Sequence, residues 1–178
     1  IQAFNAANGE RIWSVQRPGP SLALRVAQQM IAIEGLVITG LPGGRLMAIE
    51  PIAGSVVWEG IVAAPRGSSE LERVNDVVGS PVVLGDFLCA VSYQGRIGCF
   101  NISQGGRIIW AKDFSSSAGM AIDAKHTYSP DARDNVAAFA TADGAKVWRQ
   151  DGLRNRGLTS PATTGQFVVL GDFEGYAH

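Results

Sequence analysis

The sequence predicts an all-β fold, and three observations support this prediction. A Gly-x-x-x-Trp pattern occurs four times, once for each of the four tryptophans in 178 residues. A four-residue apolar segment with a small third residue lies nine or ten residues before each tryptophan. Successive copies of the combined unit begin 45, 51 and 39 residues apart, and a partial fifth copy begins 40 residues later. A period of about 40–45 residues indicates a repeat architecture, in which stacked units bury one continuous core.

The two parts of the repeat both read as short strands. The Gly-x-x-x-Trp copies combine a glycine turn with a short alternating strand, and they lie at residues 9–13, 54–58, 106–110 and 144–148. The apolar segments that precede them lie at residues 1–4, 46–49, 97–100 and 136–139. The chain ends on residues 176–178, which enter a further copy, so the sequence starts and stops at the same phase of the repeat.

Each complete unit reads as four strands separated by turns rich in Gly, Asp and Gln. The clearest unit has strands at 80–84, 87–92, 96–101 and 107–113. The other two have strands at 30–33, 36–39, 45–50 and 55–61, and at 120–123, 127–129, 136–141 and 145–149. Four short antiparallel strands in each unit of this length are typical of a β-propeller blade.

We therefore expect residues 1–178 to form one partial β-propeller. It would comprise the end of a blade (1–18), three complete blades (28–62, 79–114 and 118–150) and the start of another (158–178). A four-stranded sheet cannot bury both of its faces alone, so each face should pack on the next blade. We expect the four tryptophans to wedge between blades, which would explain their fixed position in the repeat.

Composition and charge exclude several functions. The net charge is −1, which argues against a nucleic-acid surface or a polybasic membrane patch. No run of about 18 apolar residues could form a membrane-spanning helix. Cys89 and Cys99 could pair in an oxidising compartment, but the predicted hairpin does not clearly place them on one face. We therefore expect free thiols at these two positions.

The sequence shows no catalytic, cofactor or metal site, so we expect a protein that is not an enzyme. His126 and His178 are isolated, and no His-rich metal motif is present. There is no Gly-x-Ser-x-Gly motif, and the Gly-Leu-Pro-Gly-Gly stretch at 40–44 reads as a turn. The scattered aspartates fit turn formation better than catalysis, and they are Asp76, Asp86, Asp123, Asp131, Asp134 and Asp172.

The long connections between blades are the candidate binding segments. They lie at 17–27, 63–78 and 149–158, and such connections in propellers share one rim. In the first, Leu22 and Leu24 alternate beside Arg25, so an extended loop would present two leucines next to a charge. Alternatively, the leucines pack beneath the loop as a satellite core. In the second connection Glu70, Glu72, Arg73 and Asp76 could pair with Arg25 or with a bound protein, or could simply be solvated.

Several stretches resemble a known family. The blades resemble the PQQ-type propeller repeat, and the chain is similar along its whole length to the BamB family of outer-membrane assembly lipoproteins. The stretches that are most similar are 20–25 (Pro-Ser-Leu-Ala-Leu-Arg), 72–77 (Glu-Arg-Val-Asn-Asp-Val), 80–83 (Ser-Pro-Val-Val), 158–161 (Leu-Thr-Ser-Pro) and 171–178 (Gly-Asp-Phe-Glu-Gly-Tyr-Ala-His).

The resemblance implies a scaffold without cofactors, on the periplasmic side of the outer membrane. Members of the family are eight-bladed, carry an N-terminal lipid anchor, bind the POTRA region of BamA and assist the folding of outer-membrane β-barrels. Their contact residues fall here on Leu22, Leu24, Arg25 and Asp76. A second acid of the family falls on Val78, which departs from the pattern.

The resemblance also makes this chain about four blades of an eight-bladed ring, without the lipid-bearing cysteine. A half-ring leaves two blade faces uncovered, so we expect either dimerisation or a bound partner there. One alternative is a quinoprotein dehydrogenase, which needs a calcium-binding set of Glu, Asn and Asp. Another is a factor that offers a strand edge to unfolded barrel proteins.

Overall fold

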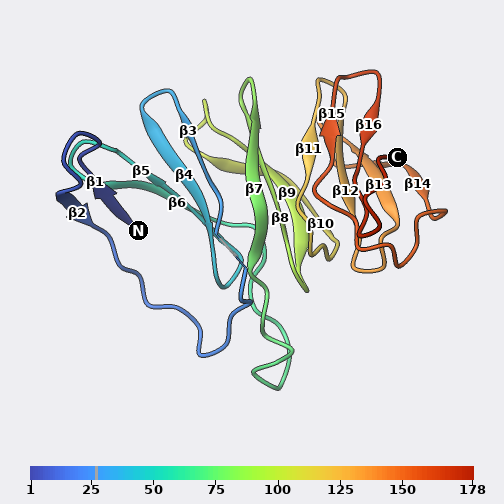
Figure 1. Ribbon diagram of the computed structural model, residues 1–178, viewed down its shortest axis with the longest axis horizontal. Coiled ribbons are helices and arrows are strands. Elements are labelled where there is room, and N and C mark those ends of the chain that lie inside the picture. Colours follow the sequence, from blue (N-terminus) through green and yellow to red (C-terminus); the bar gives the residue numbers. More distant parts are fainter. Residues whose placement is uncertain (27) are drawn as a thin grey trace.

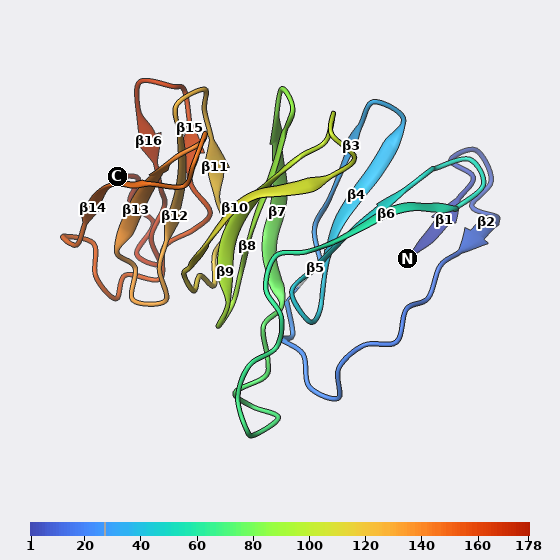
Figure 2. The same ribbon diagram turned by 180° about the vertical axis from the view of Figure 1, so that it is seen from behind.

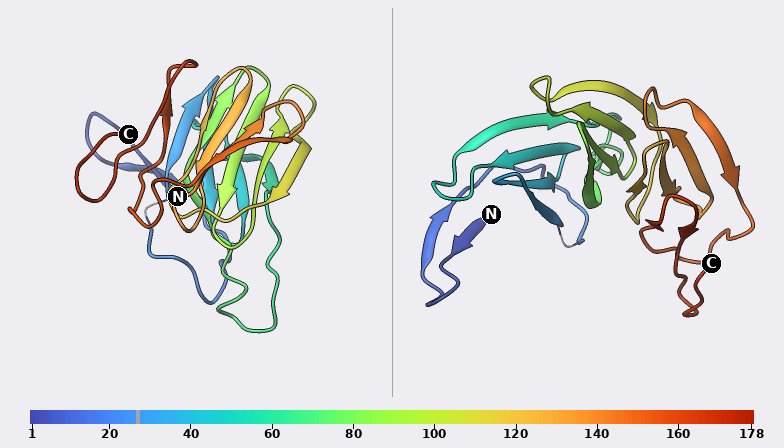
Figure 3. Two further views of the ribbon diagram at one scale, coloured as in Figure 1. Left: turned by 90° about the vertical axis from the view of Figure 1, so that its right-hand side faces the viewer. Right: turned by 90° about the horizontal axis from the view of Figure 1, so that it is seen from above.

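The computed structural model describes residues 1–26 and 28–178, and this part of the chain contains strands and no helix. In these residues, sixteen strands form five antiparallel sheets. Seen from the side, the sheets stand next to one another in chain order (Figure 1, and from behind in Figure 2). Seen from above, they follow an arc like part of a ring (Figure 3). The structure confirms the predicted all-β partial propeller.

Three of the five sheets are complete blades in which consecutive strands are neighbours. The first comprises β3 (Met30–Ile33), β4 (Leu36–Leu41), β5 (Arg45–Ile49) and β6 (Val56–Ile61). The second comprises β7 (Val77–Leu84), β8 (Phe87–Ser92), β9 (Arg96–Asn101) and β10 (Arg107–Asp113). The third comprises β11 (Ala121–Ile122), β12 (His126–Pro130), β13 (Val136–Ala140) and β14 (Lys146–Gln150).

The two remaining sheets are parts of blades at the ends of the chain. β1 (Gln2–Phe4) pairs with β2 (Arg11–Ser14) at one end of the arc. β15 (Ala162–Thr163) pairs with β16 (Val168–Val169) at the other end, where a further bridge joins Gly171 to Ala177.

Turn chemistry explains where the strands begin and end. The β3–β4 hairpin turns at Glu34 and Gly35, both with positive φ (46° and 75°), which is the conformation of a tight two-residue turn. In each complete blade, and between β1 and β2, the pairing of the last two strands shifts register just before the tryptophan. This repeated bulge re-aims the side chains that follow it, and sets every tryptophan opposite the small third residue of the preceding strand.

The hydrophobic core lies between blades. One buried cluster joins β4 and β5 of one blade to β8 and β9 of the next, and includes Ile38, Leu46, Leu88 and Phe100. A second cluster joins β8 and β9 to β11 and β13, and includes Val91, Ile97, Met120 and Phe139. The complete blades therefore bury apolar faces against one another.

Three of the four tryptophans expected to wedge between blades do so, namely Trp13, Trp58 and Trp110, whereas Trp148 is 39% exposed. The Nε1–H of Trp13 donates to the Pro51 carbonyl of the next blade (2.7 Å), and that of Trp110 donates to the Thr141 carbonyl (2.8 Å). A Cβ atom built on Gly54 would overlap the indole of Trp13. The glycine of one Gly-x-x-x-Trp copy is therefore the surface on which the tryptophan of the preceding copy lies.

The same arrangement holds at the other internal contacts. A Cβ atom on Gly106 would overlap the Trp58 indole, and one on Gly144 would overlap the Trp110 indole. Trp58 also meets Phe100 edge to face, with ring centroids 5.3 Å apart. We call each such contact, between a tryptophan and the glycine of the next copy, a Trp–Gly interlock.

The expectation of free thiols was wrong. Cys89 and Cys99 lie directly opposite each other on β8 and β9 and form a disulfide, with their Cα atoms 4.1 Å apart. Opposite residues in an antiparallel pair point to the same face, so the sulfur atoms meet. Both residues are fully buried, so the disulfide belongs to the core of the second complete blade.

Candidate functional site: a rim formed by two inter-blade loops

The two loops singled out in the sequence lie side by side on one rim. The backbone N–H of Leu24 donates to Oδ2 of Asp76 (2.5 Å), which links the first loop to the second across 52 residues of chain. In Figure 1 both loops project below the strands, on the rim opposite the β3–β4 and β7–β8 hairpins. We call the described residues 17–26 and 63–76 the double-loop rim.

Asp76 holds the double-loop rim together from inside. Its side chain is fully buried, and its Oδ1 also accepts a hydrogen bond from the backbone N–H of Gly43 (3.0 Å). One carboxylate thus joins three segments: the first loop, the second loop and the β4–β5 turn. The carboxylate of Asp76 is thus satisfied by two backbone donors inside the rim, as is usual for a buried polar group.

Leu22 and Leu24 have different environments. Leu22 is 43% exposed, whereas Leu24 is half-buried and packs against the core cluster that contains Val78 and Met120. The alternating pattern suggested that both leucines point the same way. The chain bends at Ser21 and Leu22. Leu22 is therefore exposed, whereas Leu24 packs beneath the loop. Val78, at the position where the family has a second acid, is buried in the core.

A hollow separates the two loops on this rim. Its volume is about 220 Å³, and both loops contribute to its wall. The lining residues are Pro20, Ser21, Leu22, Pro65, Glu70 and Arg73. The first loop thus contributes two apolar residues and a serine to the hollow, and the second contributes a proline, one acid and one base.

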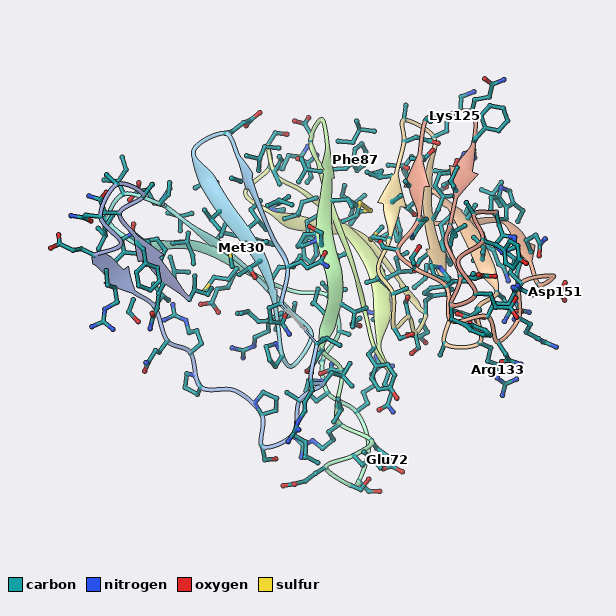
Figure 4. All side chains as sticks on the ribbon, viewed as in Figure 1. Met30, Glu72, Phe87, Lys125, Arg133 and Asp151 are labelled. Atoms are coloured by element: carbon teal, nitrogen blue, oxygen red, sulfur yellow. A yellow bond between two sulfur atoms is a disulfide. The ribbon has the colours of Figure 1, made fainter. Side chains whose placement is uncertain are left out.

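A capping motif shapes the tip of the second loop. The N–H of Ser69 donates to the Glu72 carboxylate (3.2 Å), and the N–H of Glu72 donates to Oγ of Ser69 (3.3 Å). This reciprocal pair is a capping box, which fixes a single turn. Hydrogen bonds from Ser69 and then from the N–H of Ser68 lower the pKa of Glu72, so it is ionised at neutral pH. Figure 4 shows Glu72 near the end of the projecting loop.

Leu71 lies next to Glu72 in this turn and is exposed, and its sequence neighbour Glu70 lines the hollow. The sequence reasoning overlooked Leu71 and Pro65 as surface residues of this rim. The Ser-x-x-Glu spacing of Ser69 and Glu72 is the signal that would have predicted the turn, and with it an exposed Leu71. Arg25 is exposed in the neighbouring loop, and no ion pair to it is found within 1–26 and 28–178.

Comparison with known proteins decides the family. The family model described as outer membrane protein assembly factor BamB matches residues 1–171. The chain belongs to the BamB family.

Individual BamB proteins are similar along the whole chain. The outer membrane protein assembly factor BamB of Bordetella pertussis is 62% identical over all of this chain and 46% of its own length. BamB of Burkholderia pseudomallei is 40% identical over all of this chain and 47% of its own length. The chain thus spans about half the length of these curated relatives.

A solved BamB structure has the same fold. The crystal structure of BamB from Moraxella catarrhalis superposes with a TM-score of 0.92 at 28% identity. The match covers 98% of this chain and 53% of that one. The arc of blades is therefore the architecture of about half a BamB propeller.

The polar groups near the C-terminal end of this BamB-family chain form a structural network. His178 lies 2.9 Å from the buried carboxylate of Asp172, which also accepts a hydrogen bond from Nε of Arg156 (2.6 Å). Hydrogen bonds from His178 and then from Arg156 hold the pKa of Asp172 well below its usual range. Across the described residues, no group of three or more His, Cys, Asp or Glu side chains could hold a metal ion. That same part of the chain also lacks a helix long and apolar enough to cross a membrane.

Proposed function

We propose that this chain is part of a non-enzymatic scaffold of the outer-membrane β-barrel assembly machinery, and that its double-loop rim binds the POTRA region of BamA. The observation that supports this proposal best is the hydrogen bond between Leu24 and Asp76. The family resemblance points to the two loops separately, and this hydrogen bond joins them into one continuous surface. The relatives are named outer membrane protein assembly factors, which agrees with a role in assembly.

The contact on this rim combines an apolar anchor with a charge. Leu22 on the edge of the hollow supplies apolar surface, and Arg25 supplies an exposed guanidinium without an intramolecular ion pair in the described chain. Arginine beside apolar side chains is the usual composition of a binding hot spot. Leu24 and Asp76 contribute by holding the loop in place.

We further propose that the scaffold works on the periplasmic side of the outer membrane, with a lipid anchor in the longer family protein. The Cys89–Cys99 disulfide supports an oxidising compartment, because disulfides persist in the periplasm and are rare in the cytosol.

Substitutions on the rim test the contact. We expect Leu22→Asp and Arg25→Ala each to weaken binding to the isolated POTRA region of BamA by roughly 30-fold, as for loss of a hot-spot side chain worth about 2 kcal/mol. Binding would be measured by isothermal titration calorimetry, and folding by circular dichroism. Full-strength binding by the Leu22→Asp/Arg25→Ala double variant would contradict the proposal.

Two variants on the opposite rim are matched controls. Leu84 lies at the β7–β8 hairpin and is 39% exposed, close to the 43% of Leu22. Arg107 is an exposed arginine at the start of β10. Leu84→Asp and Arg107→Ala should leave the affinity for the POTRA region unchanged, because neither residue belongs to the double-loop rim.

A further inference from the structure

The second loop of the double-loop rim projects beyond the sheets, yet its base is tied down. Nδ2 of the buried Asn75 donates to the Ala63 carbonyl (2.8 Å), which joins the two ends of the loop. The N–H of Tyr93 in the next blade donates to the Asp76 carbonyl (2.8 Å). A Cβ atom built on Gly95 would approach the Ala63 Cβ to 2.7 Å, so the β8–β9 turn packs closely on the loop base. A compact surface loop with its ends joined in this way is an Ω-loop.

A side chain from the second complete blade holds the capping-box turn at the tip of this loop. Gln94 lies in the β8–β9 turn. In the amide orientation that satisfies its neighbours, its side-chain nitrogen donates to the carbonyl oxygens of Val74 (3.1 Å) and Leu71 (3.2 Å). The backbone N–H of Gln94 donates to Oγ of Ser115 (2.9 Å), which fixes Gln94 in place. The turn is thus held both by its own capping box and by the following blade.

Leu71 is the apolar side chain that this turn presents to solvent. It is 70% exposed, compared with 43% for Leu22. The N–H of Val74 donates to the Leu71 carbonyl (3.4 Å), which Gln94 also contacts. A side chain whose backbone is already ordered loses less conformational entropy on binding. An exposed leucine on a fixed turn is therefore well suited to anchor a partner.

The tip of the second loop is continuous with the surface around Leu22. Glu70 and Arg73, which flank Leu71 in the turn, line the hollow between the two loops. Leu22 belongs to the other wall of the same hollow. Leu22 and Leu71 are therefore two exposed apolar side chains on the two loops that border one depression.

The free charges on the rim are mainly positive. Of its three acids, Asp76 is buried and Glu72 is engaged in the capping box, which leaves Glu70. Arg25 and Arg73 are exposed, and neither forms an ion pair in the part of the chain that the structure describes. A surface that complements this rim should carry acidic groups.

We propose that Leu71 is a second anchor of the double-loop rim, and that it inserts into an apolar pocket with an acidic edge on the POTRA region of BamA. Gln94 is the positioning residue that presents Leu71 to this pocket. The inference rests on the proposed function, because it adds a contact on the same rim. Leu22 and Leu71 contact the partner from the two loops that border the hollow.

Isothermal titration calorimetry with the POTRA region tests the anchor. We expect Leu71→Ala to weaken binding roughly tenfold, as for loss of an interface anchor. Ile52→Ala is the matched control, because Ile52 is 84% exposed and lies in the β5–β6 turn, on the same side of the sheet as the β3–β4 hairpin and away from the rim. This control should bind like the unchanged chain. Full affinity of Leu71→Ala would overturn the inference.

Gln94→Ala tests the positioning role. It should weaken binding roughly threefold, and the amides of residues 70–74 should exchange faster with solvent. The Gln94→Ala/Leu71→Ala double variant should bind like Leu71→Ala alone, because Gln94 acts through Leu71. Additive losses, or unchanged exchange of these amides, would show that Gln94 does not position Leu71.

Two further glutamine variants separate the hydrogen bonds from the shape of the side chain. Gln94→Glu keeps the shape but replaces the donor nitrogen with a carboxylate oxygen, so exchange at residues 70–74 should again accelerate. Gln104→Ala removes an exposed glutamine from the β9–β10 turn of the same blade, and should change neither exchange nor affinity.

A matched pair of charge changes tests the acidic edge. Arg73→Gln should weaken binding roughly twofold to threefold, and Glu70→Gln should strengthen it by a similar factor, since exposed charges contribute modestly. The reverse order of the two variants would contradict an acidic pocket.

The Leu22→Asp/Arg25→Ala variant separates this inference from the proposed function. If that variant binds weakly while Leu71→Ala binds at full strength, the rim binds the POTRA region without Leu71, and only the present inference is overturned. If both variants bind at full strength, the proposed function is overturned as well.

Discussion

At the scale of single residues, we expect Asp76 to act by holding two backbone segments together. Its carboxylate accepts from the backbone N–H groups of Leu24 and Gly43, and both bonds are lost in Asp76→Ala. We expect that variant to lose about 1–3 kcal/mol of unfolding free energy, since buried donors are left without acceptors. Asp76→Asn keeps one acceptor oxygen and should lose less.

Hydrogen exchange at Leu24 separates positioning from direct contact. In Asp76→Ala the Leu24 amide should exchange faster, and affinity for the POTRA region should fall although the Asp76 side chain is buried. Unchanged exchange at Leu24 together with unchanged affinity would show that Asp76 does not hold the loop.

At the scale of the strands, the Cys89–Cys99 disulfide fastens the β8–β9 hairpin at its centre. We expect the Cys89→Ala/Cys99→Ala variant to lose about 2–3 kcal/mol of unfolding free energy, the loss typical for a disulfide that closes a short loop. Urea denaturation would measure this difference, and added reductant should not destabilise the double variant further. A thiol assay that finds two free thiols in the unfolded, unreduced chain would contradict the pairing.

The positions of the strands were predictable from the sequence, whereas the disulfide between two of them was not predicted. Glycine turns fixed the predicted bounds of β8, β9 and β10, and these match the structure residue for residue. The same bounds place Ser92 opposite Arg96, and counting back from this pair places Cys89 opposite Cys99. The disulfide was missed because strand ends were predicted without the pairing register that follows from them.

At the scale of the whole molecule, repeat periodicity predicted the arc of blades, while the rim depended on contacts between distant residues. The loop pattern predicted Leu22, Leu24 and Arg25 as candidate contacts, and the family resemblance pointed to the same three residues and to Asp76. It could not show that Asp76 is buried, because that burial depends on the Gly43 turn and on Leu24, 52 residues away in the chain. Local patterns predict strands and turns, whereas tertiary packing decides which loop residues face solvent.

The Trp–Gly interlock predicts that equivalent glycines differ in tolerance according to whether an indole covers them. Gly144 and Gly9 have similar φ values (69° and 74°), so asparagine introduces similar backbone strain at both. Only at Gly144 would the added side chain overlap an indole, that of Trp110. We expect Gly144→Asn to lose about 1–3 kcal/mol more unfolding free energy than Gly9→Asn, the usual penalty for overpacking. Thermal denaturation would measure the difference, and equal stability of the two variants would show that the interlock does not stabilise the stack of blades.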